Sequence, residues 1–210
     1  ATLSASGLYV EQDLKEAAKW YRMAAEQGDA DAQYNLGGMH ATGTGVLQDS
    51  EEAAKWFRKA AKQGCVDAQH ALGTSYFRGL GVLQDYKEAA KWFRMAAEQG
   101  SVTAQHKLGL LYAAGIGLLQ NDKEAAKWYR KAAEKGNAVA QSDLGIMYAK
   151  GNGVPQDDIE AYAWAIMAAS NGERALLEHM EKNTEKKPLR ARAQSRAKEI
   201  AAEIELKGRK

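Results

Sequence analysis

Apolar and polar residues follow a helical period along this chain, and the whole pattern recurs every 36 residues. Within one copy, apolar residues are separated by three or four positions, as they are on one face of an α-helix. Moving residues 85–117 by 36 positions in either direction produces a near-copy of the same stretch. Five tryptophans keep this phase: Trp20, Trp56, Trp92, Trp128 and Trp164. Such a period predicts a repeat protein in which each unit buries its apolar face against its neighbours.

Each copy predicts two helices joined by a loop that contains glycines. The first helices are expected over 30–41, 66–77, 102–113 and 138–149. The second helices are expected over 50–63, 86–99, 122–135 and 158–171, with one leading helix over 14–27. Their expected N-caps are Asp13, Asp49, Asp85, Asn121 and Asp157, and glycines such as Gly28 and Gly64 should end them.

The glycine loops contain the pattern G-x-G, which also begins a dinucleotide-binding fingerprint. That fingerprint needs a preceding strand and a third glycine, whereas the segments before these loops are predicted to be helical. We therefore interpret the loops as connectors between helices.

The two ends of the chain depart from the repeat. Residues 1–13 are predicted to be the remnant of an incomplete repeat, residues 14–172 the repeat array, and residues 173–210 C-terminal capping helices with a basic tail. Within that last segment we expect a short helix over 173–181 and a charged linker over 182–187. Pro188 should open a final helix that lies on the last repeat as a lid. Its apolar stripe consists of Leu189, Ala193, Ala197, Ile200 and Ile204.

Comparison of the copies separates positions that serve stacking from positions that are free for recognition. On the first helices, residues 32, 36, 37 and 40 and their equivalents are nearly fixed, whereas residues 31, 35, 38 and 42 and their equivalents vary. The varying positions are spaced i, i+4, i+7 and i+11, so they share one helix face, which we call the variable stripe. A variable stripe is what a peptide groove would need, although drift on a solvated face would give the same pattern.

His70 and His106 add a further pair of candidates on this side of the repeats. They occupy equivalent positions on consecutive first helices, about 9–10 Å apart if these helices pack directly. Metal ligands lie near 2 Å and no third ligand recurs in phase, so contact with a partner is the favoured interpretation. The predicted partner-binding residues are Asn35, Thr42, His70, Thr74, Arg78, Thr103, His106, Lys107, Leu110, Asp143, Ile146 and Lys150. The tryptophans share the phase of the alanine stripe and are predicted to be core.

Composition and charge change this picture little. The formal net charge is +2, which is the sum of +6 on residues 182–210 and −4 on residues 1–181. The basic C-terminal segment leaves binding of nucleic acid as an alternative function of the final helix. The basic residues concerned are Arg190, Arg192, Arg196 and Lys198. The only cysteine, Cys65, excludes an intramolecular disulfide and is interpreted as a small residue at a helix junction. No apolar run approaches the roughly 18 residues that a membrane span needs.

The repeats closely resemble the Sel-one-like repeat family, a relative of the tetratricopeptide repeats. The resemblance covers about residues 7–172 and depends on a spaced set of small residues, an aromatic residue and glycines. The third copy supplies Ala89, Trp92, Ala96, Ala97, Gly100, Ala104, Gln105, Leu108, Gly109, Tyr112, Gly115 and Gly117. The resemblance implies a right-handed α-solenoid of antiparallel helix pairs whose first helices line the concave side. It further implies a scaffold or adaptor for a protein or peptide, in bacteria.

The same resemblance implies a periplasmic or secreted location, with the cytoplasm as the alternative. The chain begins at Ala1 without methionine, which fits either a removed leader or a fragment of a longer protein.

An enzymatic function is a further alternative, because cysteine-rich relatives of this family have been linked to β-lactam binding or hydrolysis. Those relatives carry paired cysteines in each repeat, and this chain carries one cysteine in total. Its one S-x-x-K pattern is Ser195–Lys198, without the S-D-N and K-T-G patterns that accompany it in β-lactamases. We therefore expect no catalytic activity, cofactor, metal or small-molecule substrate.

Overall fold

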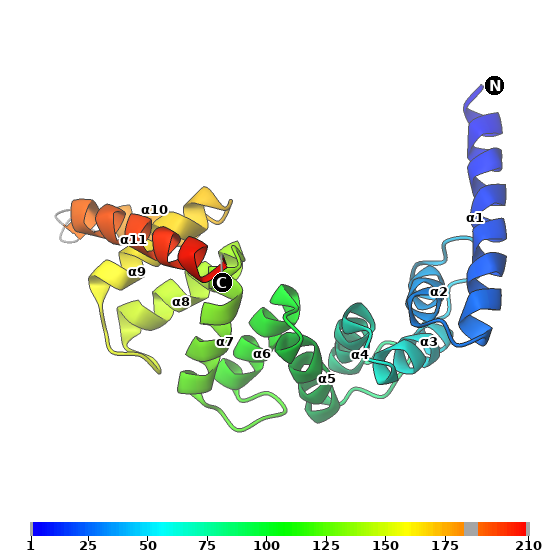
Figure 1. The fold of residues 1–210 in the computed structure, drawn as a ribbon, viewed down its shortest axis with the longest axis horizontal. Coiled ribbons are helices and arrows are strands. Elements are labelled where there is room, and N and C mark those ends of the chain that lie inside the picture. The colour runs from blue at the N-terminus through cyan, green and yellow to red at the C-terminus, as the bar shows by residue number, and fades with distance from the viewer. Residues whose placement is uncertain (1, 183–188, 209–210) are drawn as a thin grey trace. The chain divides into compact units, whose positions relative to one another are not determined.

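The computed structural model describes residues 2–182 and 189–208, which form eleven α-helices and no strand (Figure 1). The chain divides into two compact units, residues 1–101 and residues 102–210. Within each unit, consecutive helices pack as antiparallel pairs. This is the all-α solenoid of about 36-residue repeats that the sequence predicts.

The helices of both units are close to the predicted ones. The first unit contains α1 (Thr2–Glu26), α2 (Ala30–Thr42), α3 (Ser50–Lys62), α4 (Val66–Arg78) and α5 (Tyr86–Glu98). The second unit contains α6 (Val102–Ala114), α7 (Asp122–Glu134), α8 (Ala138–Lys150), α9 (Asp158–Ser170), α10 (Ala175–Lys182) and α11 (Arg190–Gly208). The eight helices α2–α9 each end within one residue of the predicted boundary.

The predicted caps of the second helices are confirmed. The side chain of Asp49 accepts hydrogen bonds from the backbone N–H groups of Glu51 and Glu52, at 2.9 and 3.0 Å. These backbone bonds lower the pKa of Asp49, because they stabilise the charged carboxylate. The equivalent side chains Asp85, Asn121 and Asp157 make the same kind of contact at the starts of α5, α7 and α9.

Glycines on the first helices allow rings of the following helix to pack against their backbone. A Cβ atom added to Gly73 would lie 2.8 Å from the ring of Phe93, which is closer than real Cβ contacts come. Gly109 and Tyr129 have the same relation, at 2.6 Å. These positions are fixed between copies because any side chain would separate the paired helices.

Four of the five tryptophans are buried, and one is exposed. Trp92 is 8% exposed and packs with Phe57 and Leu72 in the core of the first unit. Trp164 is 1% exposed in the core of the second unit, and Trp56 and Trp128 are buried likewise. Trp20 is 63% exposed, so the prediction that all five are core is wrong at this position.

The start of the leading helix also differs from the prediction. α1 runs without interruption from Thr2 to Glu26, so Asp13 lies inside the helix and does not cap it. The cap expected at Asp13 is therefore wrong, as is a helix start at Leu14.

The predicted lid is confirmed. α11 packs on α9 and buries Ala193, Ala197 and Ile200, three residues of its predicted stripe. Lys207 of α11 also forms an ion pair with Glu134 of α7, with 2.9 Å between Lys207 Nζ and Glu134 Oε1. Pro188 and residues 183–187 of the predicted linker lie outside the described residues, and Lys182 belongs to α10. None of the described helices has the length and apolar character that crossing a membrane requires.

Candidate protein-binding surface

The predicted partner-binding residues lie on α2, α4, α6 and α8, the first helices of the repeats. Six of them are exposed: Asn35, Thr42, Arg78, Thr103, Lys107 and Lys150. The other six are half-buried: His70, Thr74, His106, Leu110, Asp143 and Ile146. By contrast, the nearly fixed residues of the same helices, such as Ala68 and Leu72, are completely buried. Variation between copies is thus found at side chains that solvent can reach.

One contact joins two of these residues across neighbouring repeats of the second unit. His106 Nε2 on α6 lies 2.9 Å from Asp143 Oδ2 on α8, and the two side chains are 13% and 31% exposed. The His106 ring also packs on Tyr129, with 5.6 Å between the ring centroids. Burial raises the pKa of Tyr129, and the nearby Asp143 carboxylate raises it further. His106 and Asp143 therefore connect helices of the scaffold as well as lying at its surface.

His70 makes the corresponding ring contact in the first unit. Its ring lies 5.6 Å from that of Phe93, and Tyr34 packs on Phe57 at 5.9 Å in the repeat before. His70 and His106 thus both pack on an aromatic ring of the following helix, a role that the sequence alone does not predict.

A second set of contacts between repeats was missed in the sequence. Arg58 on α3 donates a hydrogen bond to the hydroxyl oxygen of Tyr76 on α4, with 2.9 Å between the heavy atoms. Arg130 and Tyr148 form the same pair in the second unit. In the first repeat Arg22 lies 3.3 Å from His40 Nε2, so the histidine that replaces tyrosine still faces the arginine. The sequence does contain a sign of these pairs, because in each of these repeats an arginine lies 18 residues before the tyrosine or histidine that it contacts.

The second unit has a hollow of about 440 Å³ between α8 and α10. Two predicted partner-binding residues, Ile146 and Lys150, line its α8 side. The α10 side contributes Ala175, Leu176, His179 and Met180. The sequence alone does not indicate that α10 contributes to this surface, because α10 falls outside the repeat and has no equivalent in the other copies.

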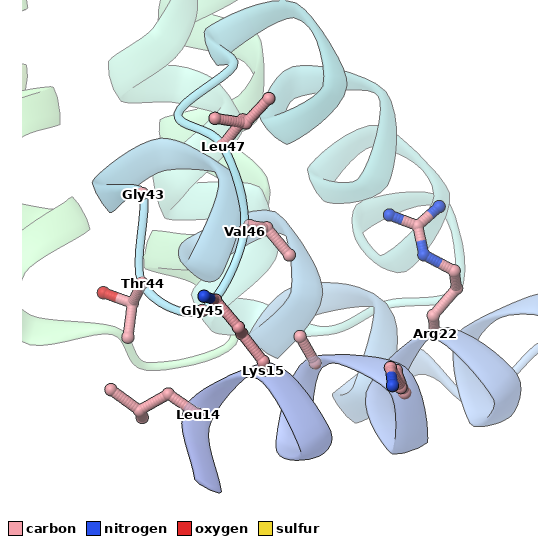
Figure 2. A pocket seen from close by; sticks show the side chains of 10 residues that line it. Leu14, Lys15, Arg22, Gly43, Thr44, Gly45, Val46 and Leu47 are labelled. Carbon is pink, nitrogen blue, oxygen red and sulfur yellow. The ribbon is translucent and has the colours of Figure 1, made fainter. Parts of the chain in front are cut away.

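The first unit has a hollow of about 880 Å³ between α1 and the loop after α2, shown in Figure 2. Leu14 and Lys15 lie beside the loop at Gly45 and Val46, and Arg22 lies farther along α1. The loop approaches α1 closely, since a Cβ atom on Gly45 would come within 2.3 Å of the carbonyl oxygen of Leu14. None of the predicted partner-binding residues lines this hollow.

Two of the four basic residues considered on the final helix are paired with carboxylates of the protein itself. The guanidinium of Arg196 bonds to Glu160 of α9 and to Glu199 and Glu203 of α11, and these carboxylates raise its pKa. Arg190 forms an ion pair with Glu181 of α10 at 3.1 Å. Two of the four arginine and lysine side chains considered for nucleic acid therefore hold the lid in place.

No metal site is found among residues 2–182 and 189–208, where no three His, Cys, Asp or Glu side chains are grouped to hold an ion. Cys65 is a free, half-buried thiol.

The Sel1 repeat matches five consecutive segments of the chain, residues 3–29, 30–65, 66–101, 102–137 and 138–173. The chain belongs to the Sel1 repeat family. This confirms the resemblance to the Sel-one-like repeats, and it extends the first repeat over residues 3–29. None of the curated proteins matches the chain.

Solved bacterial structures show the same fold. A protective antigen present in uropathogenic Escherichia coli strains, which displays an SLR fold, is 38% identical with a TM-score of 0.78 over 90% of this chain. The match spans only 41% of that antigen chain. A Sel1 repeat protein from Oxalobacter formigenes is also 38% identical, with a TM-score of 0.76 over 86% of this chain and 73% of its own. Cysteine-rich protein B of Helicobacter pylori is 25% identical, with a TM-score of 0.50 over 62% of this chain and 94% of its own.

Proposed function

We propose that this Sel1 repeat protein is a scaffold that binds a protein or peptide partner on the variable stripe of its first helices. The observation that carries the proposal is the difference in burial between the two classes of position. Residues that recur, such as Leu72 and Leu144, are 0% exposed, whereas the stripe residues Lys107 and Lys150 are exposed. Surface positions that differ from repeat to repeat, on a rigid framework, are suited to recognition.

The chemistry of the stripe supports a macromolecular partner. Its exposed members include amide, hydroxyl, ammonium and guanidinium groups, and half-buried Leu110 and Ile146 lie among them. Protein interfaces combine apolar anchors with a polar rim in this way. We propose no catalytic activity, because the one S-x-x-K pattern, Ser195–Lys198, belongs to the lid helix α11 and lacks its partner motifs.

The test compares the partners recovered by the parent protein and by a stripe variant. The stripe variant combines Asn35→Ala, Arg78→Ala, Lys107→Ala and Lys150→Ala, all at exposed positions, so each change should cost within about 0.5 kcal/mol of stability. Immobilised parent protein and variant are incubated with lysate and periplasmic extract of a bacterium that encodes the protein. The variant should lose a protein that the parent retains, while its circular dichroism spectrum is unchanged.

A control variant carries the same kind of change on the second helices and in the turn that follows α1. It combines Gln27→Ala, Lys62→Ala, Lys87→Ala and Lys123→Ala, which are also exposed. It should recover the same proteins as the parent. If the stripe variant also recovers them all, the stripe is not the binding surface.

Location and domain organisation complete the proposal. We place the protein in the periplasm or outside the cell, with the cytoplasm as the alternative, because the E. coli relative with 38% identity is a protective antigen. Fractionation of cells that express the full-length gene tests this. The division into a remnant at 1–13, an array at 14–172 and caps at 173–210 stays a prediction, and truncation at these boundaries tests it.

A further inference from the structure

The last repeat lacks a pair of rings that the other repeats have. In the earlier repeats, a ring on the first helix packs on a ring of the second helix. These pairs are Tyr34–Phe57, His70–Phe93 and His106–Tyr129, with centroids 5.9, 5.6 and 5.6 Å apart. In the last repeat the same two positions hold Ser142 and Ala165, so both rings are missing from the contact between α8 and α9.

Helix α10 replaces one of these rings. A Cβ atom on Gly145 would lie 2.9 Å from Leu176 Cδ2, just as a Cβ atom on Gly73 would lie 2.8 Å from the Phe93 ring. Leu176 therefore lies where the ring of the second helix lies in the other repeats. This explains why Ala165 is tolerated in α9.

The place of the other ring remains hollow. Ser142, which stands where other repeats have tyrosine or histidine, lines the hollow of about 440 Å³ between α8 and α10. The apolar part of the lining includes Ile146, Leu176 and Met180. An apolar hollow left by a missing ring has the shape and chemistry to receive a ring from another molecule.

The basic side chains that line this hollow favour an acidic ligand. Its lining includes Lys150 and His179 and contains no carboxylate. The stripe carboxylate on the same helix, Asp143, is bonded to His106 on α6. A ligand with negative charge next to its ring would thus meet complementary groups.

We propose that the hollow between α8 and α10 binds an aromatic side chain of an acidic segment of the partner protein. This proposal rests on the proposed function and specifies where and by what chemistry the partner is held. Lys150 and His179 bind carboxylates that flank the aromatic residue, and the ring packs on Ile146, Leu176 and Met180. Aromatic side chains that fill a pocket are typical anchors of a binding hot spot.

The test uses three fluorescein-labelled peptides and fluorescence anisotropy with the full chain. The first peptide is Gly-Asp-Glu-Phe-Glu-Asp-Gly, the second has alanine in place of phenylalanine, and the third has lysine at every acidic position. The first peptide should bind at least about tenfold more tightly than either of the others. Equal binding of the first two peptides would overturn the proposal, and this comparison requires no change to the protein.

Protein variants then locate the site. Ser142→Tyr restores the ring found in the first repeat and should lower affinity for the first peptide at least about tenfold, because the added ring occupies the hollow. Ser170→Tyr, at an exposed position of α9, is the matched control and should leave affinity unchanged. Lys150→Glu should weaken binding of the first peptide and strengthen binding of the lysine peptide, whereas Lys198→Glu, on exposed α11 surface, should do neither.

The outcomes separate this inference from the proposed function. If the combined stripe variant loses the partner but Ser142→Tyr retains both the partner and the first peptide, the scaffold function stands and the aromatic site is wrong. If the stripe variant and Ser142→Tyr both retain the partner, the proposed function fails together with this site. The site is supported if the single change Ser142→Tyr abolishes binding of both the first peptide and the partner while the circular dichroism spectrum is unchanged.

Discussion

The residue before each first helix shows how one side chain affects one repeat. Asp29 accepts a hydrogen bond from the backbone N–H of Ala32 at 2.6 Å, and Asn137 accepts one from Ala140 at 2.8 Å. Cys65 occupies the same position before α4 and makes no side-chain cap bond. The prediction that Cys65 is only a small residue at a junction thus overlooked that the position is an N-cap. α4 therefore starts without a bond that α2 and α8 have.

Cys65→Asn should stabilise the protein by about 1 kcal/mol, because it supplies this missing cap without adding charge next to Asp67. Thermal unfolding followed by circular dichroism measures the change as a higher Tm. Cys65→Ala is the control, since it removes the thiol without supplying an acceptor. Equal Tm values for the asparagine and alanine variants would show that the cap does not form.

The tryptophans show why the same residue in the same phase can have different burial. Trp56 on α3 packs with Ala25, Ala32 and Leu36, which belong to α1 and α2. A tryptophan of a second helix is thus covered by the helices that precede it in the chain. α1 is the first described helix, so Trp20 has no such cover within the described residues and is 63% exposed. Phase identifies the face of a helix, and burial depends on what packs against it.

Trp92→Ala should lower stability by roughly 3–5 kcal/mol, because it removes a large side chain from a packed contact between helices. Trp20→Ala is a matched control in the same phase and should change stability by no more than about 0.5 kcal/mol. Chemical unfolding followed by circular dichroism compares both variants with the parent protein. Similar losses in the two variants would show that the difference in burial does not hold in solution.

At the scale of elements, the sequence predicted the helices that carry local start and stop signals. The helices α2–α9 end within one residue of the predicted boundaries, because caps such as Asp85 and glycines such as Gly100 recur at each end. α1 was predicted to begin too late. A capping residue starts a helix only where the residues before it resist helix formation, and residues 2–12 contain one glycine and no proline. Continuing the helix through Gly7 costs only about 1 kcal/mol.

The C-terminal elements were predicted in part. The apolar spacing of α11 is a local signal, so its role as a lid could be predicted. The role of Leu176 could not, because α10 has no counterpart among the repeats and its contact with Gly145 depends on tertiary packing.

The ion pairs of Arg196 should hold α11 on α9. Arg196→Ala removes the bonds to Glu160, Glu199 and Glu203 and leaves the half-buried Glu160 without its guanidinium partner. Because Arg196 is 31% exposed, we expect a loss of only roughly 1 kcal/mol. Limited proteolysis should cleave within α11 several times faster than in the parent protein.

Arg192→Ala is the control for this prediction, since Arg192 is an exposed residue of the same helix. The Arg192→Ala variant should be cleaved within α11 at the same rate as the parent protein. Unchanged cleavage of Arg196→Ala would mean that apolar contacts alone, at residues such as Ala193 and Ile200, hold the lid.

At the scale of the whole molecule, the sequence predicted which face of the first helices carries the variable residues. It did not predict which side chains on that face contact each other between repeats. Residues 35, 107 and 150 could be assigned to one face from spacing alone. The bond between His106 and Asp143 joins residues 37 positions apart, and it depends on the distance between two helices that spacing does not specify. The hollow beside Ser142 likewise depends on α10, which lies outside the repeat.

The division into units at residues 101 and 102 predicts how damage spreads through the molecule. Leu72 and Leu144 occupy equivalent positions in the two units, and both are 0% exposed. Leu72→Ala should destabilise its own unit by about 2–5 kcal/mol and raise hydrogen exchange of amides in residues 30–98. Because stability in a repeat array comes mainly from neighbouring contacts, exchange in residues 138–170 should change much less.

Leu144→Ala should give the reverse pattern, with faster exchange in residues 138–170 and little change in residues 30–78. Hydrogen exchange followed by mass spectrometry resolves the two regions in one experiment, and each variant is the control for the other. Leu144 packs with Trp164 and, through the same cluster, with Ala197 and Ile200 of α11, so its loss should also free the lid. Equal acceleration of exchange in both regions by either variant would show that the molecule unfolds as one cooperative body, and that the two units are not independent in stability.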